Sequence, residues 1–312
     1  MQRPGANGTL LSEEESNEMN HENLSRVPHE LALRIQAIYD DLKSAERKAV
    51  DFILKSPEEL PGLNIVDYAD RAGCSEATIV RLSKRLGYDG YPQLKAAFEE
   101  NREGSDTGYQ EIDPGDPPLT VIKKVFDSAI TALEDTLHLL DPVQYQASLE
   151  ALLGSGQLLV CGLGDAGVVA TETSYRFNRI GKQCHAPTDP DMQLMHASKL
   201  RSGDVFIGIS HSGESSTIID VAEVAAAAGA TVIAITNFPS SPLARLATHV
   251  LQTAVFIRNW TGEIMAKRLA QLCIIESLHA NYLLRDTENS VRELRASNEV
   301  VRRNKRSSRR EV

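Results

Sequence analysis

Residues 205–217 read Val-Phe-Ile-Gly-Ile-Ser-His-Ser-Gly-Glu-Ser-Ser-Thr, and this stretch decides the fold of the larger part of the chain. Its first five residues form a short apolar run, which is typical of a strand buried in a parallel sheet. The run leads through a loop of small hydroxyl residues into the helical pattern of residues 218–228. A strand that enters a helix in this way presents unpaired backbone N–H groups and the positive end of the helix dipole at one point. The stretch therefore predicts an anion-binding site at the end of a parallel strand.

Apolar runs alternate with helical patterns throughout the second half of the chain. Besides residues 205–209, we expect strands at 158–161, 183–185, 231–236 and 250–251. The helices between them are expected at 168–180, 192–200 and 218–228. Such alternation is typical of βαβ units, in which helices cover both faces of a parallel sheet. The sequence therefore predicts an α/β domain at residues 119–285 with a doubly wound, five-stranded parallel sheet.

The loop after residue 209 carries the residues that would bind an anion. Four hydroxyl side chains, Ser210, Ser212, Ser215 and Ser216, surround Gly213, which has no Cβ to block an approaching ligand. A single serine at this place would only cap the following helix. Four serines around a glycine favour a phosphate site over a simple helix cap.

This loop resembles the Ser-x-Ser-Gly-x-(Ser/Thr) signature of sugar isomerase (SIS) domains, which bind phosphosugars, and the resemblance covers about residues 119–285. In SIS domains a second loop with the pattern G-x-G-x-S faces the serine loop across the ligand. Here that loop reads Gly162-Leu163-Gly164-Asp165-Ala166, so Ala166 removes one expected hydroxyl. The resemblance implies that a phosphosugar acts as the effector of this protein. The residues expected to bind it are Gly162, Gly164, Asp165, Ser210, His211, Ser212, Gly213, Glu214 and Ser215.

Other functions of this domain fit the sequence less well. The G-x-G-x-x-G pattern at 162–167 also occurs in dinucleotide-binding proteins, but no acidic residue ends a second strand about twenty residues further on. Isomerases of the SIS fold place a His-containing motif between the second strand and the serine loop, and residues 188–196 do not match it. His196 and His211 are candidate bases, yet the sequence assembles no base with a partner around either. We therefore expect a sensor, with a phosphosugar isomerase as the alternative and a scaffold that only dimerises as a third class.

A second pattern, at residues 64–86, predicts a helix-turn-helix. Residues 64–72 are expected to form a short helix, Gly73-Cys74 a turn, and residues 76–86 a second helix capped by Ser75. On a helical wheel, the second helix has an apolar side that is formed by Ile79, Leu82 and Leu86.

The opposite side of the second helix carries the residue types that read DNA. Arginine pairs with guanine, threonine contacts a thymine methyl or a phosphate, and basic side chains neutralise phosphates. Three basic residues on a helix also occur on ordinary solvated surfaces, so the pattern alone is weak. The predicted DNA contacts are Ser75, Ala77, Thr78, Arg81, Lys84 and Arg85.

A wider match raises the specificity of the helix-turn-helix prediction. Residues 44–48, 72–82 and 86–95 together look like the N-terminal domain of RpiR/MurR-type bacterial transcription regulators, over about sixty residues. That family joins this domain to a C-terminal SIS domain in the order found here. The resemblance implies a regulator of carbohydrate-metabolism genes that binds operator DNA and responds to a phosphorylated sugar.

The composition limits the remaining choices. The 312 residues carry a formal net charge of −10, which argues against a general attraction to nucleic acid but allows a local basic surface. The four cysteines form no C-x-x-C pair, so we expect neither a disulfide framework nor a metal site, and no cofactor. The polar, acidic first thirty residues and the lack of a long apolar run predict a cytoplasmic protein without a membrane partner.

The same patterns predict the organisation of the chain. We expect a disordered tail at 1–30, a helix-turn-helix domain at 31–104, a linker at 105–118 rich in glycine and proline, the SIS domain at 119–285, and a basic tail at 286–312.

An apolar stripe on the last predicted helix of the SIS domain indicates self-association. Because helix-turn-helix proteins commonly bind paired half-sites as two-fold dimers, we expect a homodimer or a tetramer. The competing interpretation is that the stripe packs only on its own sheet. Its members recur at three- and four-residue steps: Met265, Leu269, Leu272, Ile275, Leu278 and Tyr282.

Overall fold

The computed structural model describes residues 27–100, 112–255 and 265–306. The chain divides into two compact units between Ser105 and Asp106. Most of the predicted disordered tail and much of the predicted linker lie outside the described residues, as do residues 307–312 of the predicted basic tail.

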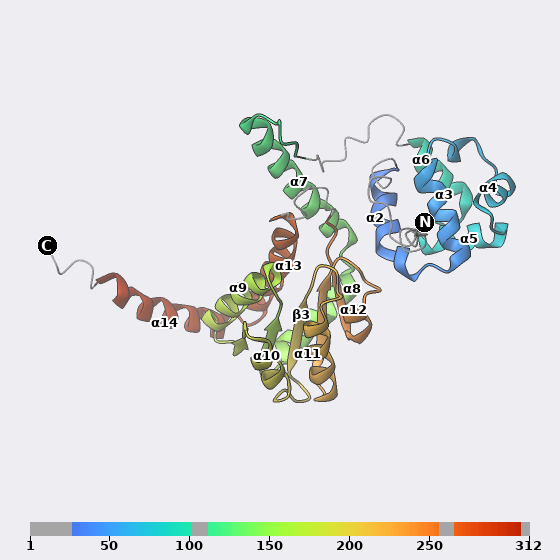
Figure 1. Cartoon of the computed structure of the whole chain (residues 1–312). Helices are drawn as coiled ribbons and strands as arrows, with labels where there is room; N and C mark the ends of the chain where they lie inside the picture. The colour runs from blue at the N-terminus through green and yellow to red at the C-terminus, as the bar shows by residue number, and fades with distance from the viewer. Residues whose placement is uncertain (1–26, 101–111, 256–264, 307–312) are drawn as a thin grey trace, which may run out of the picture. The chain divides into compact units, whose positions relative to one another are not determined.

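The N-terminal unit is helical (Figure 1). Its core includes side chains that are fully buried on every long helix, among them Ile35, Ile53, Tyr68, Ile79 and Leu94. The Tyr68 hydroxyl donates a hydrogen bond to the carbonyl of Ala49 at 2.9 Å, so the polar group of this large buried side chain has a hydrogen-bond partner. The helices are α2 (His29–Ile38), α3 (Ser44–Lys55), α4 (Ile65–Ala72), α5 (Glu76–Arg85) and α6 (Tyr91–Glu100), with short 3₁₀ turns at Tyr39–Asp41 and Leu60–Gly62.

The predicted helix-turn-helix is confirmed at α4 and α5. Asn64 caps α4 through its Oδ1 atom, which accepts a hydrogen bond from the Asp67 amide at 2.9 Å. The turn needs Gly73, because its φ of +65° lies in the left-handed region that other residues rarely adopt. Helix α3 has Lys43 as its N-cap residue, and the Lys43 amide donates to the Glu46 carboxylate at 3.2 Å.

The second unit contains the predicted five-stranded parallel sheet. The strands are β1 (Leu158–Cys161), β2 (Cys184–His185), β3 (Val205–Ile209), β4 (Thr231–Thr236) and β5 (His249–Gln252). All neighbours pair in parallel, in the order β2-β1-β3-β4-β5. The order reverses between β1 and β3, and ligands bind open α/β sheets at such a point, beyond the carboxyl ends of the strands.

Helices cover both faces of this sheet, as predicted. Buried side chains of α8 (Pro142–Gly154), α9 (Asp165–Arg179) and α13 (Met265–Arg285) form the core on one face. Those of α10 (Pro190–Ala197), α11 (Ser216–Ala227) and α12 (Pro242–Leu246) form the core on the other. A long helix, α7 (Pro118–Leu139), packs against α13.

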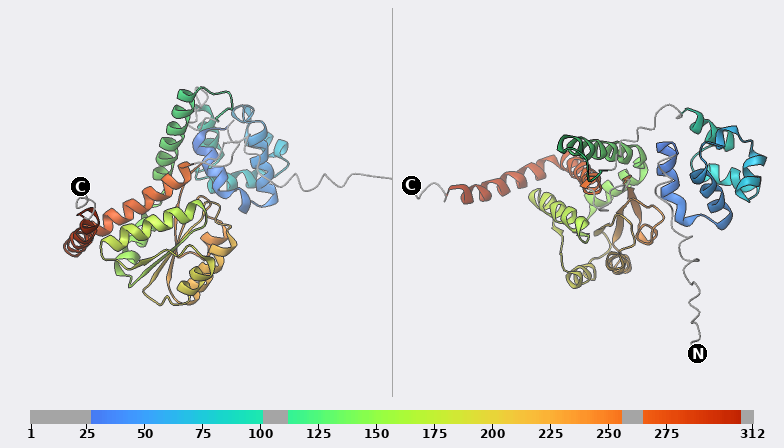
Figure 2. Two further views of the ribbon diagram at one scale, coloured as in Figure 1. Left: turned by 60° about the vertical axis from the view of Figure 1, so that its left-hand side comes forward. Right: turned by 45° about the horizontal axis from the view of Figure 1, so that its top comes forward.

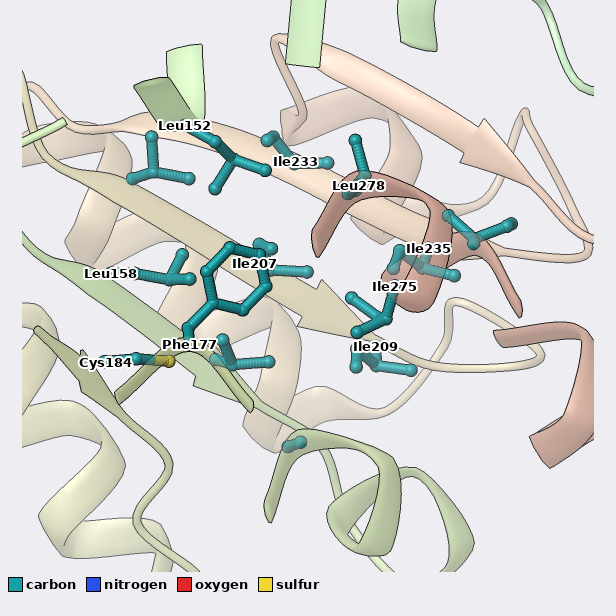
Figure 3. Packing of buried hydrophobic residues seen from close by; sticks show 14 of the residues in the cluster. Leu152, Leu158, Phe177, Cys184, Ile207, Ile209, Ile233, Ile235, Ile275 and Leu278 are labelled. Atoms are coloured by element: carbon teal, nitrogen blue, oxygen red, sulfur yellow. The ribbon is translucent and has the colours of Figure 1, made fainter. Parts of the chain in front are cut away.

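Part of the apolar stripe of α13 belongs to the core, so the prediction of a subunit interface is wrong for Ile275, Leu278 and Tyr282, whereas Met265 is 53% exposed. Ile275 is 1% exposed and Leu278 is fully buried. Figure 3 shows both side chains beside the sheet, close to Ile233 and Ile235. Apolar residues at three- and four-residue steps give the same sequence pattern whether that side of the helix packs on a sheet or on a partner chain. Here the sheet covers the buried residues.

The predicted basic tail is helical over most of its length, as α14 (Thr287–Arg306). In the described part of the chain, no helix is both long enough and apolar enough to cross a membrane.

Candidate functional site

A cavity of about 470 Å³ lies where the strand order reverses, beyond the ends of β1 and β3. It is lined by the loop after β1 with the start of α9, by the serine loop after β3 with the start of α11, and by the first turns of α13. The lining residues are Leu163, Gly164, Asp165, Ala166, Val168, Ile209, Ser210, His211, Ser215, Ile218, Lys267 and Gln271. The two loops predicted to face each other across a ligand therefore open into one cavity.

The serines of the loop have different roles in this structure. Ser210 is buried, and its Oγ accepts a hydrogen bond from the Gly213 amide at 3.1 Å. Ser212 is exposed, and its Oγ accepts from the Glu214 amide at 3.2 Å. Ser215 is the N-cap residue of α11, but its side chain makes no capping hydrogen bond. Ser215 therefore combines a position in the cavity wall with a hydroxyl that the helix does not use.

Gly213 is required for a different reason from the one the sequence suggested. Its φ is +67°, and a Cβ at this position would collide with the Ser241 side chain. The Gly213 carbonyl also accepts a hydrogen bond from the Leu243 amide at 3.0 Å. The glycine allows the serine loop to pack on the start of α12, and it does not line the cavity itself.

The loop after β1 is also held by close packing. A Cβ on Gly162 would lie 2.6 Å from the backbone of Ala166, so the turn closes only with glycine at 162. The Gly162 carbonyl accepts a hydrogen bond from Nε2 of the buried Gln193 at 3.3 Å. Ala166, which stands where the SIS pattern has serine, lines the cavity with its methyl group.

Two basic residues of α13, Lys267 and Arg268, lie beside the Asp165 carboxylate, and neither was predicted from the sequence as part of the site. The Asp165 carboxylate lies 3.9 Å from Nζ of Lys267 and 3.5 Å from Nη1 of Arg268. Lys267 lines the cavity, whereas Arg268 does not. About a hundred residues separate these partners, so only the fold brings them together. The one sequence signal is a pair of basic residues at the start of an otherwise apolar helix.

His211 presents a neutral imidazole to the cavity. Burial and the nearby Lys267 ammonium lower the pKa of His211 to about 4. Its Nδ1 atom is buried without a hydrogen-bond partner in the protein, and its ring packs edge-on against Phe238 with centroids 6.0 Å apart. At neutral pH this side chain can exchange hydrogen bonds with a ligand without adding charge.

The candidate bases do not form a catalytic pair. His196 is not among the cavity residues and stacks instead on His185, with ring centroids 4.9 Å apart. Glu214 is exposed and outside the cavity lining. Of the described residues that line the cavity, only Asp165, His211 and Lys267 carry ionisable side chains.

On α5, the structure divides the predicted DNA contacts into two groups. Ala77, Arg81 and Lys84 are exposed on one side of the helix. Thr78 is only 3% exposed, and its hydroxyl bonds to the capping Ser75 at 2.9 Å. Thr78 therefore shapes the start of the helix and is not part of its free surface.

Arg85 is also engaged within the protein. Its guanidinium lies 2.9 Å from the Glu46 carboxylate and donates to the carbonyl of Asp41 at 3.3 Å. Glu46 is buried, so this ion pair joins α5 to α3 and satisfies a charge that burial would otherwise destabilise. Arg85 is still partly exposed, but its charge is paired with Glu46, whereas Arg81 and Lys84 are the other exposed basic side chains of α5.

Comparison with known proteins agrees with this arrangement. Residues 29–103 match the family of rpiR-type helix-turn-helix domains, and residues 151–279 match the SIS domain family. The HTH-type transcriptional regulator HexR of Pseudomonas aeruginosa is 31% identical over 253 residues, which cover 81% of this chain and 88% of that protein. An HTH-type regulator of Haemophilus influenzae is 30% identical, over 79% of this chain and 88% of its own length.

One solved structure superposes on most of the chain, and a second superposes on its SIS unit. The NanR protein of Vibrio vulnificus, complexed with ManNAc-6P, superposes with a TM-score of 0.56 at 25% identity, over 87% of this chain and 98% of that one. The sugar isomerase domain of an RpiR transcription factor from Sphaerobacter thermophilus gives a TM-score of 0.53 at 26% identity, over 59% of this chain and 99% of that one.

A helix-turn-helix unit followed by an SIS domain defines a class of bacterial transcription regulators. Within that class, the chain belongs to the RpiR family. The family predicted from residues 44–95 and from the serine loop is confirmed.

Proposed function

We propose that this protein controls carbohydrate-metabolism genes by binding operator DNA through α5 and a phosphosugar in the cavity of its SIS domain. The observation that carries the proposal is the convergence of Ser215, the N-terminus of α11 and Lys267 at one cavity. The family relationship supports the regulatory role, and NanR supports the class of ligand because that relative binds ManNAc-6P.

The proposed phosphate position is the start of α11. The first amides of a helix have no partner within the helix, and the helix dipole favours a negative charge there. Ser215 adds a hydroxyl donor, and Lys267 adds a positive charge from α13. The sugar hydroxyls would then meet Asp165, the neutral His211 and Gln271, which offer both donors and acceptors.

We propose sensing without turnover. Moving a proton between neighbouring carbons at neutral pH requires a base with a pKa near 7. The pKa of His211 is lowered to about 4, so this imidazole is a weak base for that step. The alternative, a phosphosugar isomerase, predicts interconversion of an aldose phosphate and a ketose phosphate in a coupled assay.

For DNA, we propose that Ala77, Arg81 and Lys84 face the major groove. A small residue at the start of a recognition helix permits close approach, arginine reads guanine, and lysine contacts phosphate. Thr78 and Arg85 would position this surface from within the protein.

For assembly, we propose a homodimer that uses α7 instead of α13. The exposed apolar residues of α7 recur at helical spacing, which places them on one side of the helix. A second copy of the chain is the partner that a two-fold operator requires. The proposed contact residues are Leu119, Ile122, Phe126 and Ile130.

Two measurements on the full-length protein test the proposal. Thermal shift against a panel of hexose phosphates, with N-acetylmannosamine 6-phosphate included, should find a ligand that raises the melting temperature. The unphosphorylated sugars are the matched control and should give no shift. An electrophoretic shift with the DNA upstream of its own gene should show specific binding. Absence of both effects would contradict the proposal.

A further inference from the structure

Two basic residues lie in the first turn of α13, where a helix disfavours positive charge. Lys267 and Arg268 are the third and fourth residues of this helix, and its first turn has no acidic residue. The positive end of the helix dipole lies at this end, so cations there cost stability unless a negative charge is close by. Helices α9 and α13 lie side by side (Figure 2), and the Asp165 carboxylate lies beside both cations.

The same carboxylate creates a conflict in a cavity that binds a phosphosugar. Asp165 is the one acidic residue among the described residues that line the cavity. It is also the first residue of α9, where the helix dipole favours a negative charge. Salt screens charges effectively only beyond about 8 Å, so within a cavity of about 470 Å³ this carboxylate repels a bound phosphate. The site therefore needs a cation that neutralises Asp165 without occupying the phosphate position.

The two cations of α13 are placed differently with respect to this requirement. Nη1 of Arg268 lies 3.5 Å from Oδ1 of Asp165, whereas Nζ of Lys267 lies 3.9 Å from Oδ2. Lys267 lines the cavity and Arg268 does not. Arginine keeps its charge at any physiological pH, and its planar guanidinium matches the geometry of a carboxylate. Arg268 can therefore stay with Asp165 while Lys267 turns to a phosphate.

We infer that Arg268 is a positioning residue of the phosphosugar cavity: it holds the Asp165 carboxylate, so that Lys267 is left to bind the phosphate. This inference rests on the proposed phosphosugar site and explains how an acidic residue is tolerated there. Two cations and one carboxylate leave one positive charge, which Lys267 presents to the cavity. Without Arg268, the carboxylate holds Lys267 and repels the phosphate.

The test is phosphate binding by full-length variants, with inorganic phosphate as the probe because it has no sugar hydroxyls that Asp165 could bind. The dissociation constant is obtained from the rise of the melting temperature with phosphate concentration at constant ionic strength. Arg268→Gln should raise the Kd about tenfold, because the carboxylate then competes for Lys267 and repels the anion. Asp165→Asn should lower the Kd several-fold, because Lys267 then has no competitor. Arg268→Lys keeps the charge and should restore most of the affinity.

The decisive comparison is Arg268→Gln in the Asp165→Asn background. Because Arg268 acts through Asp165, the substitution should change the Kd less than about twofold in that background. An equal loss of affinity in both backgrounds would overturn the inference, since Arg268 would then attract the phosphate directly. A Kd of Arg268→Gln equal to that of wild type would also overturn the inference and leave the proposed function standing.

Arg176→Gln is the matched control. Arg176 also joins α9 to α13, through the Glu276 carboxylate at 3.4 Å, but it lies about three helical turns from Asp165 and outside the cavity lining. This variant should bind phosphate as wild type does. A loss as large as that of Arg268→Gln would assign the effect to the packing of α9 on α13 and would overturn the inference. If wild-type protein does not respond to inorganic phosphate, the phosphate site fails, and the proposed function fails with it.

Discussion

Replacing Ser215 by alanine tests the proposed phosphate position most selectively. A serine at a helix N-cap usually contributes about 1 kcal/mol to stability through its capping hydrogen bond. Ser215 makes no such bond, so Ser215→Ala should leave the melting temperature close to that of the wild type. The effect of the substitution on a ligand can therefore be measured in a protein that is folded as before.

The expected loss of affinity follows from the charge of the ligand. A hydrogen bond to a charged group contributes about 1.5–3 kcal/mol, and each 1.4 kcal/mol is a factor of ten, so the phosphosugar Kd should rise about 10- to 150-fold. Ser216→Ala is the matched control, because its hydroxyl is adjacent in sequence but exposed and outside the cavity lining. The control should change Kd less than about twofold.

Isothermal titration calorimetry with the phosphosugar selected by thermal shift measures both values. The unliganded affinity for DNA should be the same in the two variants, because neither residue is on α5. If Ser215→Ala binds the phosphosugar as tightly as wild type, the phosphate does not lie at the start of α11. An equal loss in Ser216→Ala would show that the helix start, and not the cavity hydroxyl, is being perturbed.

Other substitutions test the remaining parts of the account. Because the pKa of His211 is lowered to about 4, the unfolded chain binds more protons between pH 6.5 and 4, and the free energy of unfolding should fall by up to about 3 kcal/mol across that window. When urea unfolding is compared at pH 7 and pH 4.5, His211→Gln should show a smaller fall than wild type, though not none, because burial also lowers the pKa values of His185, His249 and His279. An identical fall in both proteins would contradict the assignment. Arg81→Ala should cost about 1–3 kcal/mol of operator binding in an anisotropy titration, whereas Lys84→Ala should weaken binding to all duplexes alike. Phe126→Glu on the exposed side of α7 should give a folded monomer in light scattering, and a stable dimer of this variant would exclude α7 as the interface. Ile275→Glu places a charge in the core and should therefore unfold the SIS unit.

The fold could be predicted from the sequence because the patterns that indicate its strands, turns and helix caps are local. The run Val205–Ile209 and the serine loop predict a parallel strand that enters a helix, and β3 and α11 form at those residues. The turn at Gly73 and the cap at Ser75 are equally local, and α4 and α5 follow them.

The parts that sequence could not predict depend on contacts between distant residues. Lys267 reaches the cavity only because α13 crosses the sheet beside the loop that carries Asp165. The burial of Thr78 and the pairing of Arg85 with Glu46 depend on how α5 packs on α3. The apolar stripe of α13 had two interpretations, and only the packing of Ile275 on the sheet decides between them.

Effector-dependent DNA binding is the measurement that tests the central claim most directly. The full-length protein is titrated, at one salt concentration, onto fluorescent duplex DNA from the region upstream of its own gene, without sugar and with a saturating phosphosugar. Coupling between two sites typically changes the affinity at one of them by about 5- to 150-fold, so the affinity for this DNA should change by that factor when the phosphosugar is bound. The Ser215→Ala variant should need at least about tenfold more phosphosugar to reach the same change. An affinity for this DNA that stays constant at every concentration of a phosphosugar that does bind the protein would contradict the claim.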